Sequence, residues 1–242
     1  MGERHITVML LAIIAFTAWL STLERFHDFL PALLDGAITT GSIASIASFL
    51  ACAFGVTAAL ARLYGPLPVR WCARGYIEVF RGTSLLVQLF WLFFVLPTFG
   101  IWLAPFTVAV LALGLNTGAY GAEIIRAAIE AVPRGQWEAS SAVNMTRGQA
   151  LHRIILPQAV VLMAPPWGNL FIELLKSTAL VSLITIPDLA FRASEINTLT
   201  MKTTDIFVLV LLAYFAMSLA ITILMRLVQS AASRGVAPGG AP

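Results

Sequence analysis

The residues of this sequence that could bind a polar molecule are few, and several lie within long apolar stretches. Glu173 and Lys176 stand three positions apart, so a helix would place them on one face, where they can form an ion pair. Asn169 stands four residues before Glu173 and shares that face. Pro165-Pro166 is expected to interrupt the helix and free backbone groups for binding. A carboxylate beside free backbone dipoles suits a zwitterion, and a purely structural ion pair is the alternative.

Enzyme chemistry finds no support in the sequence. The apolar segments contain no paired carboxylates, Ser/His pair or His/Glu metal cluster, and no Gly-x4-Gly-Lys-Ser/Thr loop for nucleotide phosphates occurs. Cys52 and Cys72 lack a partner motif and are interpreted as small buried or lipid-facing residues. The excess of 15 Lys and Arg over 12 Asp and Glu is too small and too dispersed for nucleic-acid binding. We therefore expect no catalytic residue and no metal site.

Other polar residues in apolar surroundings allow two interpretations. Asn116 and Thr117 share one helical stripe, and they either line a solute path or hydrogen-bond neighbouring helices. Gln88 is a further candidate for the path. Glu123 and Arg126, three positions apart, are interpreted as a structural ion pair.

The elements that position these residues are predicted to be membrane-spanning helices. Of the 242 residues, 59% are hydrophobic and 11% are charged, whereas a soluble domain carries about 25% charged residues. A helix needs about 20 apolar residues to cross a bilayer. The candidate spans are Ile6–Leu23, Ala37–Leu63, Ser84–Phe99, Ala104–Ile125, a broken region Pro157–Ile186, and Ile206–Val228. The first could instead be a signal peptide, but Ser21-Thr22-Leu23-Glu24 is a poor cleavage site, which favours a retained helix.

The basic residues predict the orientation of these spans. Four arginines fall between the second and third spans, four between the fourth and fifth, and two after the sixth, which makes ten on one side. The loops on the other side hold only Arg25, Arg192 and Lys202. Because basic residues are enriched in cytoplasmic loops, both termini are predicted to be cytoplasmic.

The connection at residues 131–157 is predicted to be structured. Pro133 suits the start of a short helix over residues 134–143. Asn144 can then adopt the left-handed conformation that ends a helix. Thr146 and Gln149 have the spacing of a capping box, which opens a second helix.

The result is a helix, a tight turn and a helix at the cytoplasmic mouth, after which Leu156-Pro157 is expected to bend the chain back into the membrane. From these residues alone, the segment is either a connector that rests on lipid headgroups or a docking element for another protein.

Residues in this segment resemble the EAA loop of ABC-importer permeases. Glu138-Ala139-Ser140, Asn144 and Ile154-x-Leu156-Pro157 follow its spacing, although Ser140 replaces an alanine and Asn144 a glycine. The stretches 78–88, 116–136 and 174–182 resemble the polar amino-acid permease subfamily. Residues 78–100, 144–145 and 172–188 look closest to ectoine and hydroxyectoine permeases.

This resemblance implies an all-α, polytopic membrane helix bundle of about six helices, similar to a type I ABC-importer permease. Residues 1–234 would form one transmembrane domain, with an extra helix and external loop at 1–36, a cytoplasmic coupling loop at 131–157, and a disordered tail at 235–242. The implied contacts with the ATPase are Gln136, Glu138, Ala139, Asn144 and Arg147.

The resemblance also implies partners in a bacterial inner membrane. These are a dimer of ATPase subunits, a second identical or homologous permease, an extracytoplasmic solute-binding protein, and membrane lipids. The ATPase subunits would use ATP and Mg²⁺, which this chain is not expected to bind. The expected function is import of ectoine, hydroxyectoine or a polar amino acid by alternating access. The alternative is a secondary transporter or channel driven by an ion gradient, which would leave the structured cytoplasmic segment without a task.

Overall fold

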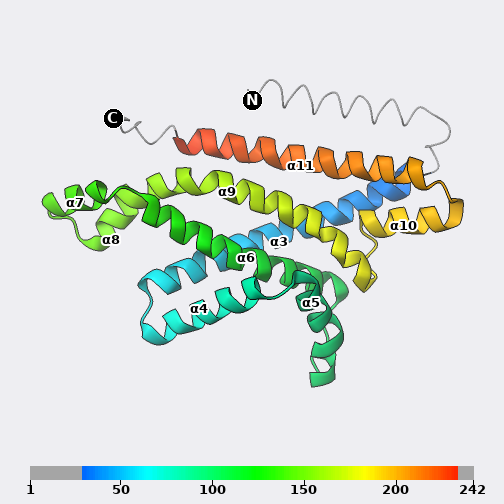
Figure 1. Ribbon diagram of the computed structural model, residues 1–242, viewed down its shortest axis with the longest axis horizontal. Coiled ribbons are helices and arrows are strands. Elements are labelled where there is room, and N and C mark those ends of the chain that lie inside the picture. The colour runs from blue at the N-terminus through cyan, green and yellow to red at the C-terminus, as the bar shows by residue number, and fades with distance from the viewer. Residues whose placement is uncertain (1–28, 234–242) are drawn as a thin grey trace.

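A computed structural model describes residues 29–233, and every regular element in that range is a helix (Figure 1). Four of these helices are long and apolar enough to cross a membrane, and a bent pair brings the number to as many as five. The first predicted span, Ile6–Leu23, and the tail at 235–242 lie outside the described residues. The predicted all-α membrane bundle is confirmed for the described part of the chain.

Two long helices, α3 (Leu30–Tyr64) and α6 (Pro105–Ala131), pack closely along the centre of the bundle. Their interface consists largely of small residues, such as the fully buried Ala47 and Ala109. Gly114 makes the approach possible, because a Cβ there would lie 2.8 Å from the Leu50 Cδ2 atom. Such interfaces suit membrane helices, whose association depends on close van der Waals packing.

The remaining long helices cover this pair. The helix α9 (Leu156–Ser177) packs on α6, and α11 (Thr203–Ser233) lies along α9 (Figure 1). The short helix α10 (Leu189–Thr200) joins them at one end, where it contacts α3 and α11.

The helix boundaries differ from the predicted spans at several ends. The helix α3 begins at Leu30, inside the predicted external loop, and α6 continues to Ala131, beyond Ile125. The start of α3 and the end of α6 thus lie in sequence that carries charged residues, because a helix can continue past the apolar core into the headgroup region.

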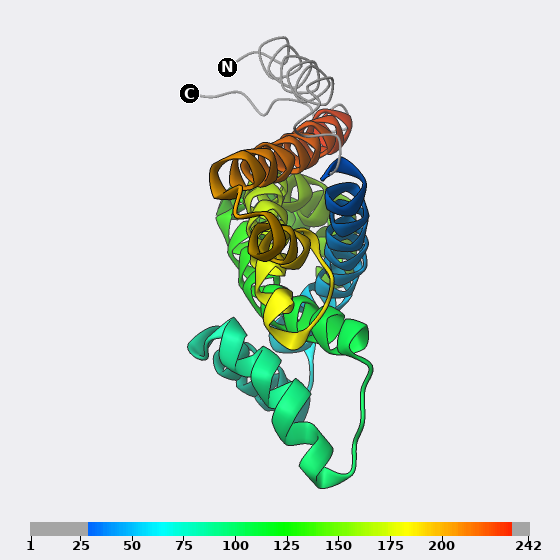
Figure 2. The same cartoon turned by 90° about the vertical axis from the view of Figure 1, so that its right-hand side faces the viewer.

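The predicted loop between the second and third spans is instead a helix, α4 (Leu67–Gly82). Its residues have helical spacing, so Ala73 and Ile77 are buried on one face while Arg74 is exposed on another. After a bend of 106°, the chain continues as α5 (Leu85–Phe90), a π-helical turn (Trp91–Val95) and a 3₁₀ turn (Leu96–Phe99). Figure 2 shows α4 and α5 projecting from the side of the bundle.

The predicted interruption at Pro165-Pro166 is wrong, because α9 runs through both prolines. The bend expected at Leu156-Pro157 is also absent. The helix α8 (Arg147–Ala150), a π-helical turn (Leu151–Ile155), α9 and a 3₁₀ turn (Thr178–Ile184) form one helical run of 38 residues. Packing of the residues that follow the prolines holds the helix together, as neighbouring helices do for prolines in membrane spans.

Candidate functional site

The connection that was predicted to be cytoplasmic is called here the coupling segment (residues 131–157), and its residues 133–149 have the predicted local structure. The helix α7 (Arg134–Ala142) follows Pro133, and Asn144 adopts a left-handed φ of 60°. Thr146 and Gln149 form the capping box, in which the Gln149 backbone N–H donates to Thr146 Oγ1 at 3.3 Å and the Thr146 N–H donates to Gln149 Oε1 at 3.0 Å. The sequence therefore specified this turn through interactions between near neighbours.

The five residues predicted to contact an ATPase are all exposed. They are Gln136, Glu138, Ala139, Asn144 and Arg147. Ser140, in contrast, is buried, and its hydroxyl donates to the Trp137 carbonyl oxygen at 2.7 Å. A small residue is thus required at position 140, where α7 packs on the protein, whereas the other face of α7 is open to a partner.

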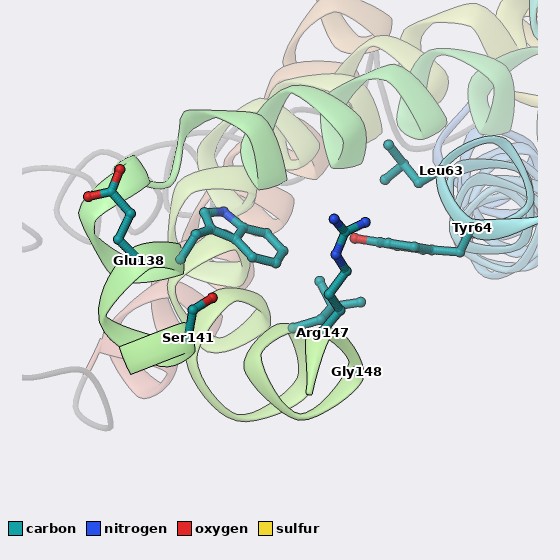
Figure 3. A pocket seen from close by; sticks show the side chains of 8 residues that line it. Leu63, Tyr64, Glu138, Ser141, Arg147 and Gly148 are labelled. Carbon is teal, nitrogen blue, oxygen red and sulfur yellow. The ribbon is translucent and has the colours of Figure 1, made fainter. Parts of the chain in front are cut away.

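A hollow of about 900 Å³ separates α7 and α8 from the end of α3. In Figure 3, Arg147 and Tyr64 point toward one another across it, while the Glu138 carboxylate points away. Leu63 and Trp137 contribute apolar walls. Tyr64 and Trp137 were not among the predicted site residues, because their proximity depends on how α3 ends beside the coupling segment.

A second polar region joins α4, α5 and α6. The Asn116 amide donates to the Phe80 carbonyl oxygen at 2.9 Å and to Gln88 Oε1 at 3.2 Å. Gln88 Nε2 in turn donates to Thr83 Oγ1 at 2.6 Å. These bonds join the α4–α5 bend to α6. Asn116 therefore hydrogen-bonds neighbouring helices, which is one of its two predicted roles. Thr117 is buried in the same helix.

Glu123 is the centre of an ion-pair cluster that joins three helices. The predicted pair with Arg126 is confirmed, with 2.7 Å between Arg126 Nε and Glu123 Oε2. Arg62 of α3 also bonds Glu123, and Arg81 of α4 lies 3.6 Å from it. Arg126 further bonds Glu130 at 2.6 Å. Arg62 and Arg81 were not predicted as partners, because they are distant from Glu123 in the chain.

The predicted ion pair between Glu173 and Lys176 is absent from the described residues, and both side chains are exposed. Glu173 and Asn169 instead line an open hollow of about 530 Å³, called here the central hollow. Arg81 and Tyr120 line the same hollow, together with the paired Glu123 and Arg126. The structure therefore places two predicted pathway residues in one hollow with Arg81, which was counted only among the arginines between the second and third spans.

Asp188, which was not predicted to matter, is fully buried at the start of α10. Its Oδ1 atom accepts a bond from the Phe191 backbone N–H at 2.9 Å and caps the helix. Burial raises the pKa of this carboxyl from 3.8 to about 6, because it disfavours the ionised form. No cluster of three or more His, Cys, Asp or Glu residues suited to a metal occurs within residues 29–233.

Comparison with known proteins places this geometry in context. Residues 51–236 match the family described as binding-protein-dependent transport system inner membrane component. The chain is 45% identical over 219 residues to the probable amino-acid ABC transporter permease protein y4tF of Sinorhizobium fredii, which covers 86% of this chain and 90% of that protein. It is 43% identical over 171 residues to the L-cystine transport system permease protein TcyB of Bacillus subtilis, covering 71% and 73%.

A crystal structure of an amino acid ABC transporter with histidines has a similar fold. Its matching chain is 36% identical, with a TM-score of 0.80, and the match covers 85% of this chain and 96% of that one.

Proposed function

The chain belongs to the binding-protein-dependent transport system inner membrane component family, and we propose that it moves a small polar zwitterion into the cytoplasm by alternating access. It is the permease subunit of an amino-acid ABC importer and has no catalytic role, since the ATPase of such importers is a separate subunit. The proposed solutes are ectoine, hydroxyectoine or a polar amino acid. The relatives' names include permeases for cystine, glutamine and arginine.

The continuous helical run from Arg147 to Ile184 is the observation that carries the mechanism. It begins in the coupling segment and contains Glu173 of the central hollow. At 1.5 Å per residue, about 39 Å of helix separates Arg147 from Glu173. A helix of this kind transmits a displacement along its axis, so movement at α7 and α8 would shift the wall of the hollow.

The source of that movement is proposed to be a dimer of ATPase subunits that bind ATP and Mg²⁺. Closure of the dimer would displace α7 through Gln136, Glu138 and Ala139, with Asn144 and Arg147 at the edge of the contact. Their exposure supports this assignment. A rigid-body response is expected because the capped turn joins α7 to α8, and α7 packs on α8 and on the π-helical turn that begins the long helical run.

The complete transporter would contain further subunits. A second identical or homologous permease would close the path on the side that the central hollow leaves open, and an extracytoplasmic binding protein would deliver the solute. In a bacterial inner membrane, the arginine distribution favours cytoplasmic termini. Asn169 and Glu173 are proposed to line the path, and Asn116, Thr117 and Gln88 remain predicted contributors near it.

Glu138→Arg tests the coupling assignment. We expect loss of ATP-driven uptake and of ATPase co-purification, because the substitution reverses a charge on the exposed face of α7. The control is Glu195→Arg, the same charge reversal at an exposed position of α10 at the other end of the bundle (Figure 1), where it also removes the ion pair with Arg192. Unchanged uptake and association for Glu138→Arg would contradict the assignment, and uptake that needs an ion gradient but no ATP would favour the secondary-transporter alternative.

A further inference from the structure

The central hollow contains exposed side chains of opposite charge. Arg81 comes from the end of α4, and Glu173 comes from α9. Tyr120 of α6 and Asn169 of α9 add a hydroxyl and an amide to the lining. A volume of about 530 Å³ falls within the range of small-molecule pockets.

This hollow lies beside the middle of α6, measured along the full length of that helix. Tyr120 is about 22 Å of helix from the start of α6 at Pro105 and about 17 Å from its end at Ala131. Arg81 lies over the Tyr120 ring, with 5.3 Å between the guanidinium carbon and the ring centroid. Exposed charges on helices that cross a membrane are costly against lipid, so Arg81 and Glu173 are expected to face a polar path or a charged ligand.

Arg81 is only loosely held by the Glu123 cluster. Its Nη1 atom is 3.6 Å from the Glu123 carboxylate, whereas Arg126 is at 2.7 Å and Arg62 is also in direct contact. The Arg81 side chain is 42% exposed. Since Arg62 and Arg126 already neutralise Glu123, the guanidinium of Arg81 keeps donors for another acceptor.

Glu173 is the complementary free group. No hydrogen bond or ion pair reaches its carboxylate from residues 29–233, and the side chain is exposed to the hollow. An ionised carboxylate only accepts hydrogen bonds, so its natural ligand is a cationic donor.

We propose that Arg81 and Glu173 form a clamp for a zwitterion, in which Arg81 binds the solute's carboxylate and Glu173 binds its ammonium or amidinium group. The inference rests on the proposed import function and assigns its ligand contacts. Arginine suits the anionic end, because its planar donors match a carboxylate in bidentate geometry. A solute that carries only one charge leaves the other residue of the clamp unpaired at membrane depth and is therefore disfavoured.

The first test measures uptake by the complete transporter in proteoliposomes, with its ATPase and binding protein, using labelled L-glutamine, L-cystine, L-arginine and ectoine. Arg81→Gln is expected to lower uptake at subsaturating solute by about tenfold or more, the loss typical of a charged hydrogen bond. Arg81→Lys should retain part of the wild-type uptake. The control Arg74→Gln removes an α4 arginine that lies over Trp71, away from the hollow, and should change little.

A second measurement separates ligand binding from a structural role. In a Cys52→Ser, Cys72→Ser background, Arg81→Cys and Glu173→Cys are treated with thiol reagents that attach either a trimethylammonium or a sulfonate group. The clamp predicts that only the cationic reagent restores uptake at position 81 and only the anionic one at position 173. Equal effects of both reagents, or wild-type uptake by Arg81→Gln, would overturn the clamp.

Failure of the proposed function gives a different result. In that case the wild-type proteoliposomes accumulate none of the four probes when ATP is supplied. If the wild type transports a probe and the Arg81 and Glu173 variants match it, the importer stands and the clamp is wrong.

Discussion

Gly121→Ala should loosen the attachment of α9 to the core. Trp167 of α9 is 6% exposed and lies against Gly121 of α6 and Gly55 of α3. A Cβ at position 121 would lie 2.4 Å from Trp167 Cη2, a separation that real Cβ atoms do not adopt. The indole cannot simply move aside, because a Cβ on Gly55 would already be 3.2 Å from the same ring.

The expected cost follows from two opposing effects. Overpacking in a filled core costs about 1–3 kcal/mol. Replacing glycine by alanine within a helix gains up to about 1 kcal/mol. Gly121→Ala should therefore destabilise the protein by up to roughly 2 kcal/mol. Gly41→Ala in α3 is the matched control, because no atom lies within 4 Å of a Cβ there, and it should be neutral or stabilising.

The midpoint of thermal unfolding in detergent, followed by circular dichroism, is measured for both variants. ATP-driven uptake shows whether the variant with a displaced α9 still transports solute. A lower midpoint for Gly121→Ala and an unchanged or higher one for Gly41→Ala are expected. Equal midpoints for the two variants would refute the close packing of Trp167 between the two glycines.

Two further predictions concern single residues outside the spans. The pKa of the Asp188 carboxyl is raised to about 6 in the folded protein. Between pH values of about 4 and 6 this carboxyl is protonated in the folded protein but ionised in the unfolded chain, so the stability falls as the pH rises through that range. Asp188→Asn keeps a capping oxygen and should stabilise the protein at pH 7 by at most about 3 kcal/mol, with little effect at pH 4, as urea unfolding would show. Asn144, at a φ of 60°, should tolerate glycine, whereas Asn144→Val should cost about 1–2 kcal/mol and reduce ATPase association; equal association of the two would contradict this.

The sequence predicted best the features that depend on neighbouring residues. The turn at Asn144 and the capping box of Thr146 and Gln149 involve residues only a few positions apart, and both are confirmed. The Glu123–Arg126 pair is confirmed for the same reason. Arg62 and Arg81 could not be assigned to that cluster from the sequence, because only the packing of α3 and α4 on α6 brings them to it.

The errors arose where packing overrides local preference. Pro165 and Pro166 each lack a backbone donor, yet Trp167 fits against the glycines of two other helices and keeps α9 continuous. Gly168 similarly lies close to Met225 of α11, since a Cβ there would be 3.2 Å from the Met225 Cβ. The helix α4 was missed because its arginines were counted as loop residues, whereas its apolar residues have helical spacing.

The most direct test of the account asks whether the coupling segment and the central hollow move as one body. Spin labels on Gly148→Cys and Lys176→Cys, in the Cys52→Ser, Cys72→Ser background, are separated by about 42 Å of helix. A third label on exposed Ile38→Cys of α3 provides the reference.

Pulsed electron–electron double resonance measures the distances between these labels in the complex with its ATPase. The nucleotide-free and ATP-trapped states are compared. The distance between positions 148 and 176 should stay constant, while the distance from either position to residue 38 changes. A change between 148 and 176, or constant distances for every pair, would contradict transmission of movement through α9.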